Sequence, residues 1–196
     1  MDIDYSKFIS YSRDVLLTKI HQHLNEARFQ HCLNVEKTAI ALAQHYQGDI
    51  NRAGLAGLIH DYAKQRSDEE FKQVIIQQHF DPELLAYNNA IWHGIVGAYF
   101  IENELNIHDE QILNAVRRHT IGAPKMSKLD KIVFVADFIE PNREFPGVNE
   151  ARQLADEDLD AAVRFEICHT LIYLIQKQVT IYPGTLLTYN ALVPNH

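Results

Sequence analysis

The chain has 196 residues, 46% of them hydrophobic, and its 26 Asp and Glu against 18 Lys and Arg give a formal net charge of −8. This composition is typical of a globular protein and excludes a disordered or collagen-like chain. The length fits one domain spanning residues 1–196, and the acidic balance argues against a nucleic-acid partner, which would need a basic surface.

Helical patterns follow one another through the first half of the chain. Apolar spacing predicts helices over residues 12–24, 25–46, 52–64, 67–79 and a short one from residue 81. Ser12 and Asn51 are the expected N-caps of the first and third helices, and Gly48 is expected to end the second. The sequence Ser67-Asp68-Glu69-Glu70 is a capping box.

The second half continues in the same way. Further helices are predicted over residues 91–105, 109–120, 127–139, 149–155 and 158–178. Gly122-Ala123-Pro124 and Pro141 interrupt the series, and Val179-Thr180-Ile181 is a weak strand candidate. The sequence therefore predicts an all-α fold, a single helical bundle of mostly short helices.

Neither a targeting segment nor a membrane partner is expected. The N-terminal MDIDYSKF is acidic and lacks the apolar stretch of a signal peptide. Residues 84–101 carry no charged side chain, but Asn88, Asn89 and His93 interrupt them, which favours a buried core segment over a membrane span. Cys32 and Cys168 are too few for a disulfide framework, so we expect a cytoplasmic protein with reduced thiols.

Histidine and aspartate recur inside or at the ends of these apolar helices. The residues concerned are His31, His60, Asp61, His93, His119 and Asp137. Taken singly, each is more often a hydrogen-bonded core histidine, or an aspartate that caps a helix or pairs with an arginine, than a metal ligand. The histidines expected on exposed faces or at ends are His21, His23, His45, His79, His108 and His196, and His169 is left unassigned.

As a set, the six residues indicate a metal site. Imidazole and carboxylate together suit a borderline metal such as iron, manganese, zinc or nickel. Six ligands exceed the need of a tetrahedral zinc, and suit one octahedral ion or two ions about 3.5–4 Å apart. Because the adjacent His60 and Asp61 would point about 100° apart on a helix, both can line one cavity only if it wraps around the helix end.

This ordered set resembles the signature of the HD-domain phosphohydrolase superfamily. His31, His60-Asp61 and Asp137 match the signature, and His93 and His119 resemble the members with two metal positions. The chain is also similar to the bacterial YqeK-like branch in the strings Leu58-Ile59-His60-Asp61-Tyr62-Ala63-Lys64, Trp92-His93-Gly94, Arg118-His119-Thr120, Ala136-Asp137-Phe138-Ile139-Glu140-Pro141 and Leu187-Thr188-Tyr189-Asn190. An isolated His-Asp pair would be weak evidence, whereas this series spans nearly the whole chain.

The resemblance implies a single HD-type metallohydrolase domain that cleaves bis(5′-nucleosyl) tetraphosphates symmetrically, turning diadenosine tetraphosphate into two ADP. It implies one or two divalent or trivalent metal ions, with a preference for iron. His31, His60, Asp61 and Asp137 are expected to hold the primary metal. His93 and His119 either hold a second metal or contact the phosphates directly.

A nucleoside polyphosphate is densely anionic, so an acidic protein needs local cations to bind it. We assign catalytic roles to Asp61 and to Lys64, which lies one turn later and can reach a phosphate held on the metal. Asn34, Thr120 and Arg143 are further substrate-binding candidates. The alternative to a role in substrate binding is that these side chains only occupy polar or solvated positions at the edge of the cavity.

Two other functions remain open. One keeps the fold and changes the substrate, as a nucleotidase or a hydrolase of guanosine alarmones. The other is a metal- or nucleotide-binding sensor without turnover, against which the six candidate ligands and Lys64 argue. A homodimer is also left open.

Overall fold

The computed structural model describes residues 3–193, and the regular structure in that range is entirely helical. Its α-helices are α1 (Arg13–His21), α2 (Glu26–His45), α3 (Ile50–Ile59), α4 (Asp68–Gln77), α5 (Asn89–Ile95), α6 (Gly97–Leu105), α7 (Glu110–Arg118), α8 (Lys128–Ile139), α9 (Val148–Glu157), α10 (Leu159–Gln176) and α11 (Pro183–Leu192). A 3₁₀ helix, η1 (Pro82–Ala86), lies between α4 and α5. The all-α prediction is confirmed, and His196 lies outside the described residues.

Local hydrogen bonds explain why several helices begin where the sequence predicts. Ser12 caps α1, and Ser67 and Ser127 form capping boxes with Glu70 and Asp130 at the starts of α4 and α8. Each capping oxygen accepts a backbone N–H that has no partner within the first turn. These caps define the first residue of each of the three helices.

The prediction for the third helix was wrong at both ends. Its N-cap is Asp49, whose carboxylate accepts the N–H groups of Asn51 and Arg52, each at 3.0 Å, so the helix starts before Asn51. It stops at Ile59, and the next residues form tight turns in which the Lys64 N–H donates to the Asp61 carbonyl at 2.8 Å.

Three further predictions differ from the structure. Gln47, with φ +53°, takes the left-handed position after α2, and the Gly48 N–H donates to the Ala43 carbonyl at 2.7 Å. The helix expected over 91–105 is divided at Val96 into α5 and α6. The strand candidate over residues 179–181 is irregular, and α11 was not predicted although Pro183 occupies its first turn.

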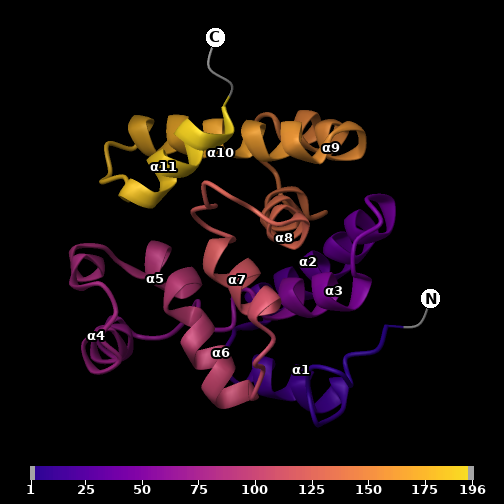
Figure 1. Cartoon of the computed structure of the whole chain (residues 1–196), viewed down its shortest axis with the longest axis vertical. Coiled ribbons are helices and arrows are strands. Elements are labelled where there is room, and N and C mark those ends of the chain that lie inside the picture. The colour runs from indigo at the N-terminus through magenta and orange to yellow at the C-terminus, as the bar shows by residue number, and fades with distance from the viewer. Residues whose placement is uncertain (1–2, 194–196) are drawn as a thin grey trace.

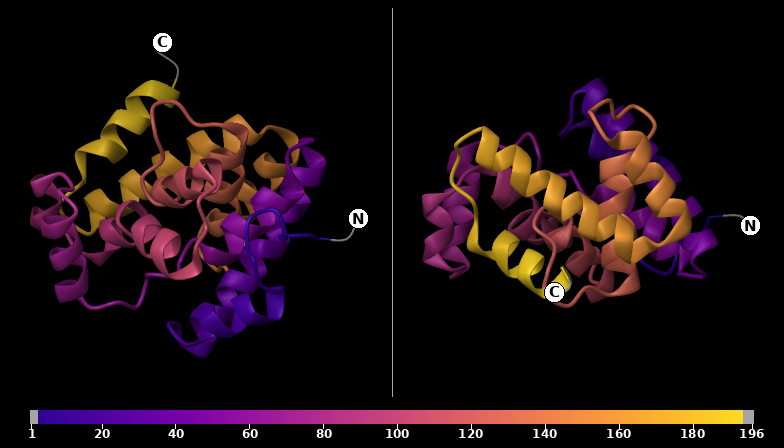
Figure 2. Two further views of the ribbon diagram at one scale, coloured as in Figure 1. Left: turned by 60° about the horizontal axis from the view of Figure 1, so that its bottom comes forward. Right: turned by 90° about the horizontal axis from the view of Figure 1, so that it is seen from above.

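Helix α8 lies in the middle of the molecule, with α2, α3 and α7 on one side and α9 and α10 on the other (Figure 1). Helices α10 and α11 run next to each other beyond it (Figure 2). Helices α2 and α3 approach closely at Gly57, which has no Cβ. A Cβ at this position would lie only 3.0 Å from the Val35 carbonyl oxygen. This packing brings the middle of α2, the end of α3 and the end of α8 together.

Among residues 3–193, no helix is long and apolar enough to cross a bilayer. The uncharged segment 84–101 instead contributes Leu84, Trp92 and Ile101 to the hydrophobic core, as expected from its polar interruptions.

Candidate metal centre

The six predicted metal ligands meet in the interior of the molecule. They are His31 on α2, His60 and Asp61 at the end of α3, His93 on α5, His119 at the end of α7, and Asp137 on α8. Five are buried, and the Asp137 side chain is 19% exposed. Because α3 ends at Ile59, the turn that follows allows His60 and Asp61 to face one cavity at the helix end. This is the condition under which two adjacent residues were expected to line the same site.

Hydrogen bonds fix the orientation of all four histidine rings. Nδ1–H of His60, His93 and His119 donates to the backbone carbonyls of Gly57, Asn89 and Val116, at 2.7, 2.6 and 2.7 Å respectively. Nδ1–H of His31 donates to the Glu140 carboxylate at 3.1 Å. Since these bonds use the Nδ1 proton, each neutral ring turns an Nε2 lone pair toward the cavity.

The Nε2 lone pairs converge in two pairs. His31 and His60 have their Nε2 atoms 3.3 Å apart, and those of His93 and His119 are 3.1 Å apart. Two lone pairs at these distances repel each other unless a proton or a cation lies between them. The donor set therefore fits a metal cation, with imidazole and carboxylate ligands for a borderline ion.

Asp61 lies between the two histidine pairs. Its Oδ1 is 3.3 Å from His93 Nε2 and 3.7 Å from His119 Nε2. Its Oδ2 is 3.4 Å from His60 Nε2 and 3.8 Å from His31 Nε2. Asp61 thus offers one carboxylate oxygen to each histidine pair and would contribute a ligand on either side.

Asp137 adds a second carboxylate on the side of His31 and His60. Its Oδ1 lies 3.0 Å from His31 Nε2 and 3.8 Å from His60 Nε2. Burial would raise the pKa of Asp137, but the neighbouring His31, His60 and Arg143 hold it well below its ordinary value. The pKa of Asp61 is likewise held low against burial by His60, His119 and His93. Both groups are thus ionised at neutral pH, the form that binds metal.

Two contacts of the cluster were missed from the sequence. Arg28 donates from Nη1 to Asp61 Oδ2 at 2.8 Å. Glu140 accepts from His31 Nδ1, and its other oxygen accepts from Asn34 Nδ2 at 3.1 Å and from the Asn142 backbone N–H at 2.8 Å. Glu140 is buried and lies in the string that carried the family resemblance, which was the available signal.

We expect Glu140→Gln to lower metal affinity by about tenfold to a hundredfold, the usual effect of losing a partner that orients a ligand. A glutamine has one side-chain oxygen, which can accept either from His31 Nδ1 or from Asn34 Nδ2 and the Asn142 N–H, but not from both sides. The amide NH₂ then faces a donor on the other side, and the His31 ring must turn if its own partner is lost. Metal titration of the apoprotein measures the effect. Glu150→Gln, an exposed change on α9, is the control, and equal affinity in both variants would show that His31 is oriented without Glu140.

Lys64 turns into the cluster rather than toward solvent. Its Nζ lies 3.1 Å from His93 Nε2 and 3.3 Å from His93 Nδ1. Burial lowers the pKa of Lys64, and burial together with the Lys64 charge lowers the pKa of His93 to about 3. The neutral His93 imidazole is the form that could act as a ligand.

The predicted substrate contacts lie around the same cavity. The Thr120 hydroxyl is buried without a hydrogen-bond partner among the described residues. Arg143 donates from Nε to the Asp137 carbonyl at 2.9 Å and pairs with the Asp137 carboxylate. The Asn34 amide is held by Glu140 and by Gln30, whose Nε2 donates to it at 3.2 Å. Thr120 is therefore the freest of these three side chains.

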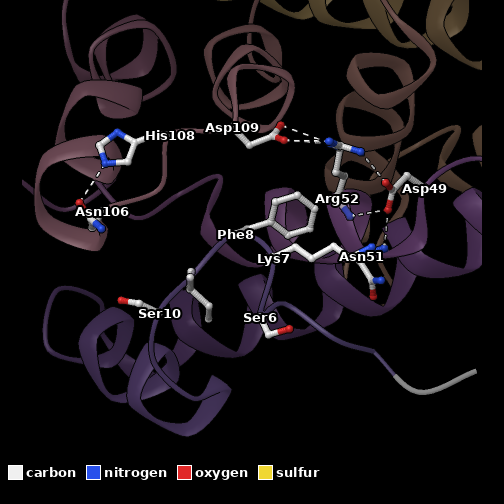
Figure 3. Close-up of a pocket in the computed structure, with 11 residues that line it drawn as sticks. Ser6, Lys7, Phe8, Ser10, Asp49, Asn51, Arg52, Asn106, His108 and Asp109 are labelled. Atoms are coloured by element: carbon white, nitrogen blue, oxygen red, sulfur yellow. Dashed lines mark hydrogen bonds and ion pairs between the residues drawn. The ribbon is translucent and has the colours of Figure 1, made fainter.

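A hollow of about 600 Å³ opens beside the cluster, and His119 and Asp137 form part of its wall. A separate hollow of about 670 Å³ lies near the N-terminus around Arg52 (Figure 3). There the Arg52 guanidinium already pairs with Asp49 at 2.7 Å and Asp109 at 2.9 Å. The first hollow is the better candidate for a substrate, because it joins the ligand cluster.

Comparison with known proteins places these residues in a family. The HD domain model matches residues 28–142. The chain is 44% identical over 182 residues to the bis(5′-nucleosyl)-tetraphosphatase, symmetrical, of Bacillus subtilis, covering 93% of this chain and 98% of that protein. A protein of the same name from Halalkalibacterium halodurans is 43% identical, with coverages of 93% and 97%.

A solved structure agrees with the fold. A crystal structure from Clostridium acetobutylicum, described as that of a predicted HD superfamily hydrolase involved in NAD metabolism, superimposes with a TM-score of 0.88 at 36% identity. The match covers 93% of this chain and 97% of that one.

Proposed function

Because the chain belongs to the HD-domain family, we propose that it is a metal-dependent hydrolase that cleaves diadenosine tetraphosphate symmetrically into two ADP. The observation that carries the proposal is the convergence of four imidazole Nε2 atoms on the Asp61 carboxylate, beside a hollow of about 600 Å³. The similarity to symmetrical tetraphosphatases over 93% of the chain supports the substrate.

Membership in this family implies a divalent metal, and the residues fit one. His31, His60, Asp61 and Asp137 would hold the primary ion, and His93 and His119 with the other Asp61 oxygen would hold a second ion or contact a phosphate. We propose iron, which accepts this mixture of imidazole and carboxylate. When bound, the metal supplies Lewis acidity toward phosphoryl oxygens and acidifies a water that serves as the nucleophile.

The remaining polar groups act on the substrate. The tetraphosphate must be held with its central bridge at the cluster, so that each side of the cleaved bond keeps two phosphates. Lys64, Arg143 and Thr120 surround the cluster with an ammonium, a guanidinium and a free hydroxyl, which would donate to phosphoryl oxygens as negative charge develops. The cations are needed because the protein carries a net charge of −8.

Metal analysis followed by product identification tests the proposal. The purified protein is stripped of metal, reloaded with iron, manganese or zinc, and incubated with diadenosine tetraphosphate. We expect ADP as the product, with highest turnover for iron. ATP and AMP would contradict symmetrical cleavage, release of phosphate from nucleoside monophosphates would indicate a nucleotidase, and no turnover on any of these substrates or on guanosine tetraphosphate would indicate a sensor.

The proposal includes a cytoplasmic location. Self-association into a homodimer stays a prediction, which sedimentation of the metal-loaded protein would test.

A further inference from the structure

The hollow beside the six candidate metal ligands has one wall made by a single face of α10. Glu166, His169, Thr170 and Tyr173 line it, and their spacing of three, four and seven residues places them on one helix face. His119 and Asp137 of the candidate ligand cluster line the same hollow. A phosphate chain held at the cluster would therefore lead the attached nucleoside into this hollow.

Glu166 is the unexplained residue of that wall. The residue is only 6% exposed, and its Oε2 is buried without a hydrogen-bond partner among the described residues. The neighbouring cation, Arg143, is bound to Asp137. Burial, and next the charge of Asp137, raise the pKa of Glu166 well above its ordinary value. A buried polar atom without a partner is costly, which points to a partner supplied by a ligand.

The rest of the hollow suits a flat aromatic ligand. Phe138 and Phe145 lie with ring centroids 4.5 Å apart, and Phe145 lies 5.0 Å from the His169 ring. All three rings line the hollow and are partly exposed. Aromatic faces of this kind stack on nucleobases, and a volume of about 600 Å³ lies in the usual range for small-molecule sites.

We propose that this hollow receives one nucleobase of the substrate, and that Glu166 hydrogen-bonds the edge of that base and selects adenine. The Glu166 carboxyl group can accept a hydrogen bond from an amino group at the base edge in either protonation state. The edge assigned to Glu166 is the N7 edge, where adenine presents the N6 amino group as a donor, whereas guanine presents two acceptors, N7 and O6. The inference rests on the proposed function and adds to it the residue that determines base specificity.

Binding of products to the metal-loaded protein tests the inference. Calorimetric titrations with ADP, GDP and pyrophosphate compare the wild type with Glu166→Leu, Glu166→Gln and the surface control Glu150→Leu. We expect Glu166→Leu to weaken ADP binding by about tenfold to a hundredfold, because the base edge loses its partner. Pyrophosphate binding should stay unchanged. Glu166→Gln should retain most ADP affinity, since the amide oxygen also accepts a hydrogen bond from the amino group.

Several results would overturn the inference: equal ADP affinity in Glu166→Leu and wild type, an equal loss of pyrophosphate affinity, or tighter binding of GDP than of ADP to the wild type. The last comparison needs no variant and so does not depend on folding of Glu166→Leu. The proposed function is judged separately, by the products that the wild type forms. A wild type that cleaves the tetraphosphate without the Glu166 effect would reject only the base contact, and one that shows the Glu166 effect without cleavage would reject only the reaction.

Discussion

Asp137→Ala is expected to release bound metal and to reduce turnover of diadenosine tetraphosphate by roughly a thousandfold or more, since a metal ion stabilises transition-state charge by several kcal/mol. The Asp137 Oδ1 atom lies 3.0 Å from His31 Nε2, so the change removes one of the two carboxylates at that histidine pair. Helix content should stay near normal, because α8 is held by its Ser127 capping box and by buried Phe134 and Val135. Metal analysis, steady-state kinetics and circular dichroism measure the three effects.

Asp130→Ala is the matched control on the same helix. Asp130 accepts from Arg118 Nη1 at 2.6 Å and belongs to the capping box, but it does not belong to the ligand cluster. This variant should melt at a lower temperature and keep its metal, the reverse of the Asp137 pattern. Full metal occupancy and activity in Asp137→Ala would show that Asp137 is only the ion-pair partner of Arg143 and not a metal ligand.

Lys64→Ala should keep the metal and lose about 2–4 kcal/mol of transition-state stabilisation, a fall in turnover of roughly thirtyfold to a thousandfold. An ammonium cannot ligate a cation, but Lys64 Nζ lies 3.1 Å from His93 Nε2, at the border of the cluster. If His93 gives this lone pair to a metal, the ammonium becomes available to a phosphoryl oxygen. Lys64→Met, which keeps the apolar stem, should show the same fall and separates the charge from packing.

The kinetic constants distinguish two roles for Lys64. A contact made mainly in the transition state lowers kcat, whereas one made equally with the bound substrate raises KM and leaves kcat level. If both constants match the wild type while metal content is normal, Lys64 has no part in the reaction despite its position beside His93.

Much of the helical framework was predictable, because each helix carries a local signal. Ser67 and Ser127 are followed three residues later by an acidic side chain, which is enough to start a helix. The start of α3 was not predictable, because Asp49 and Asn51 can both act as N-caps and only the packed chain selects between them. The apolar pattern over residues 91–105 cannot show that the backbone turns at Val96.

The candidate ligands were predictable for a similar reason: a histidine or aspartate at the end of an apolar helix is conspicuous. Arg28 and Glu166 are single charged residues with no local pattern around them, and Glu140 is marked only by the string that carried the family resemblance. Their roles depend on what the fold places opposite them, which for Arg28 is Asp61 and for Glu140 is His31. Such partners are set by tertiary packing, so local helix and cap patterns do not predict them.

The six candidate ligands are spread along the chain from α2 to α8. A bound ion would therefore act as a cross-link between parts of the polypeptide that are distant in sequence. Because the unfolded chain cannot assemble this set, metal binding favours the native state by mass action. The supply of metal in the cell would then govern the lifetime of the polypeptide as well as its rate of reaction, since a chain that opens more often is more readily degraded.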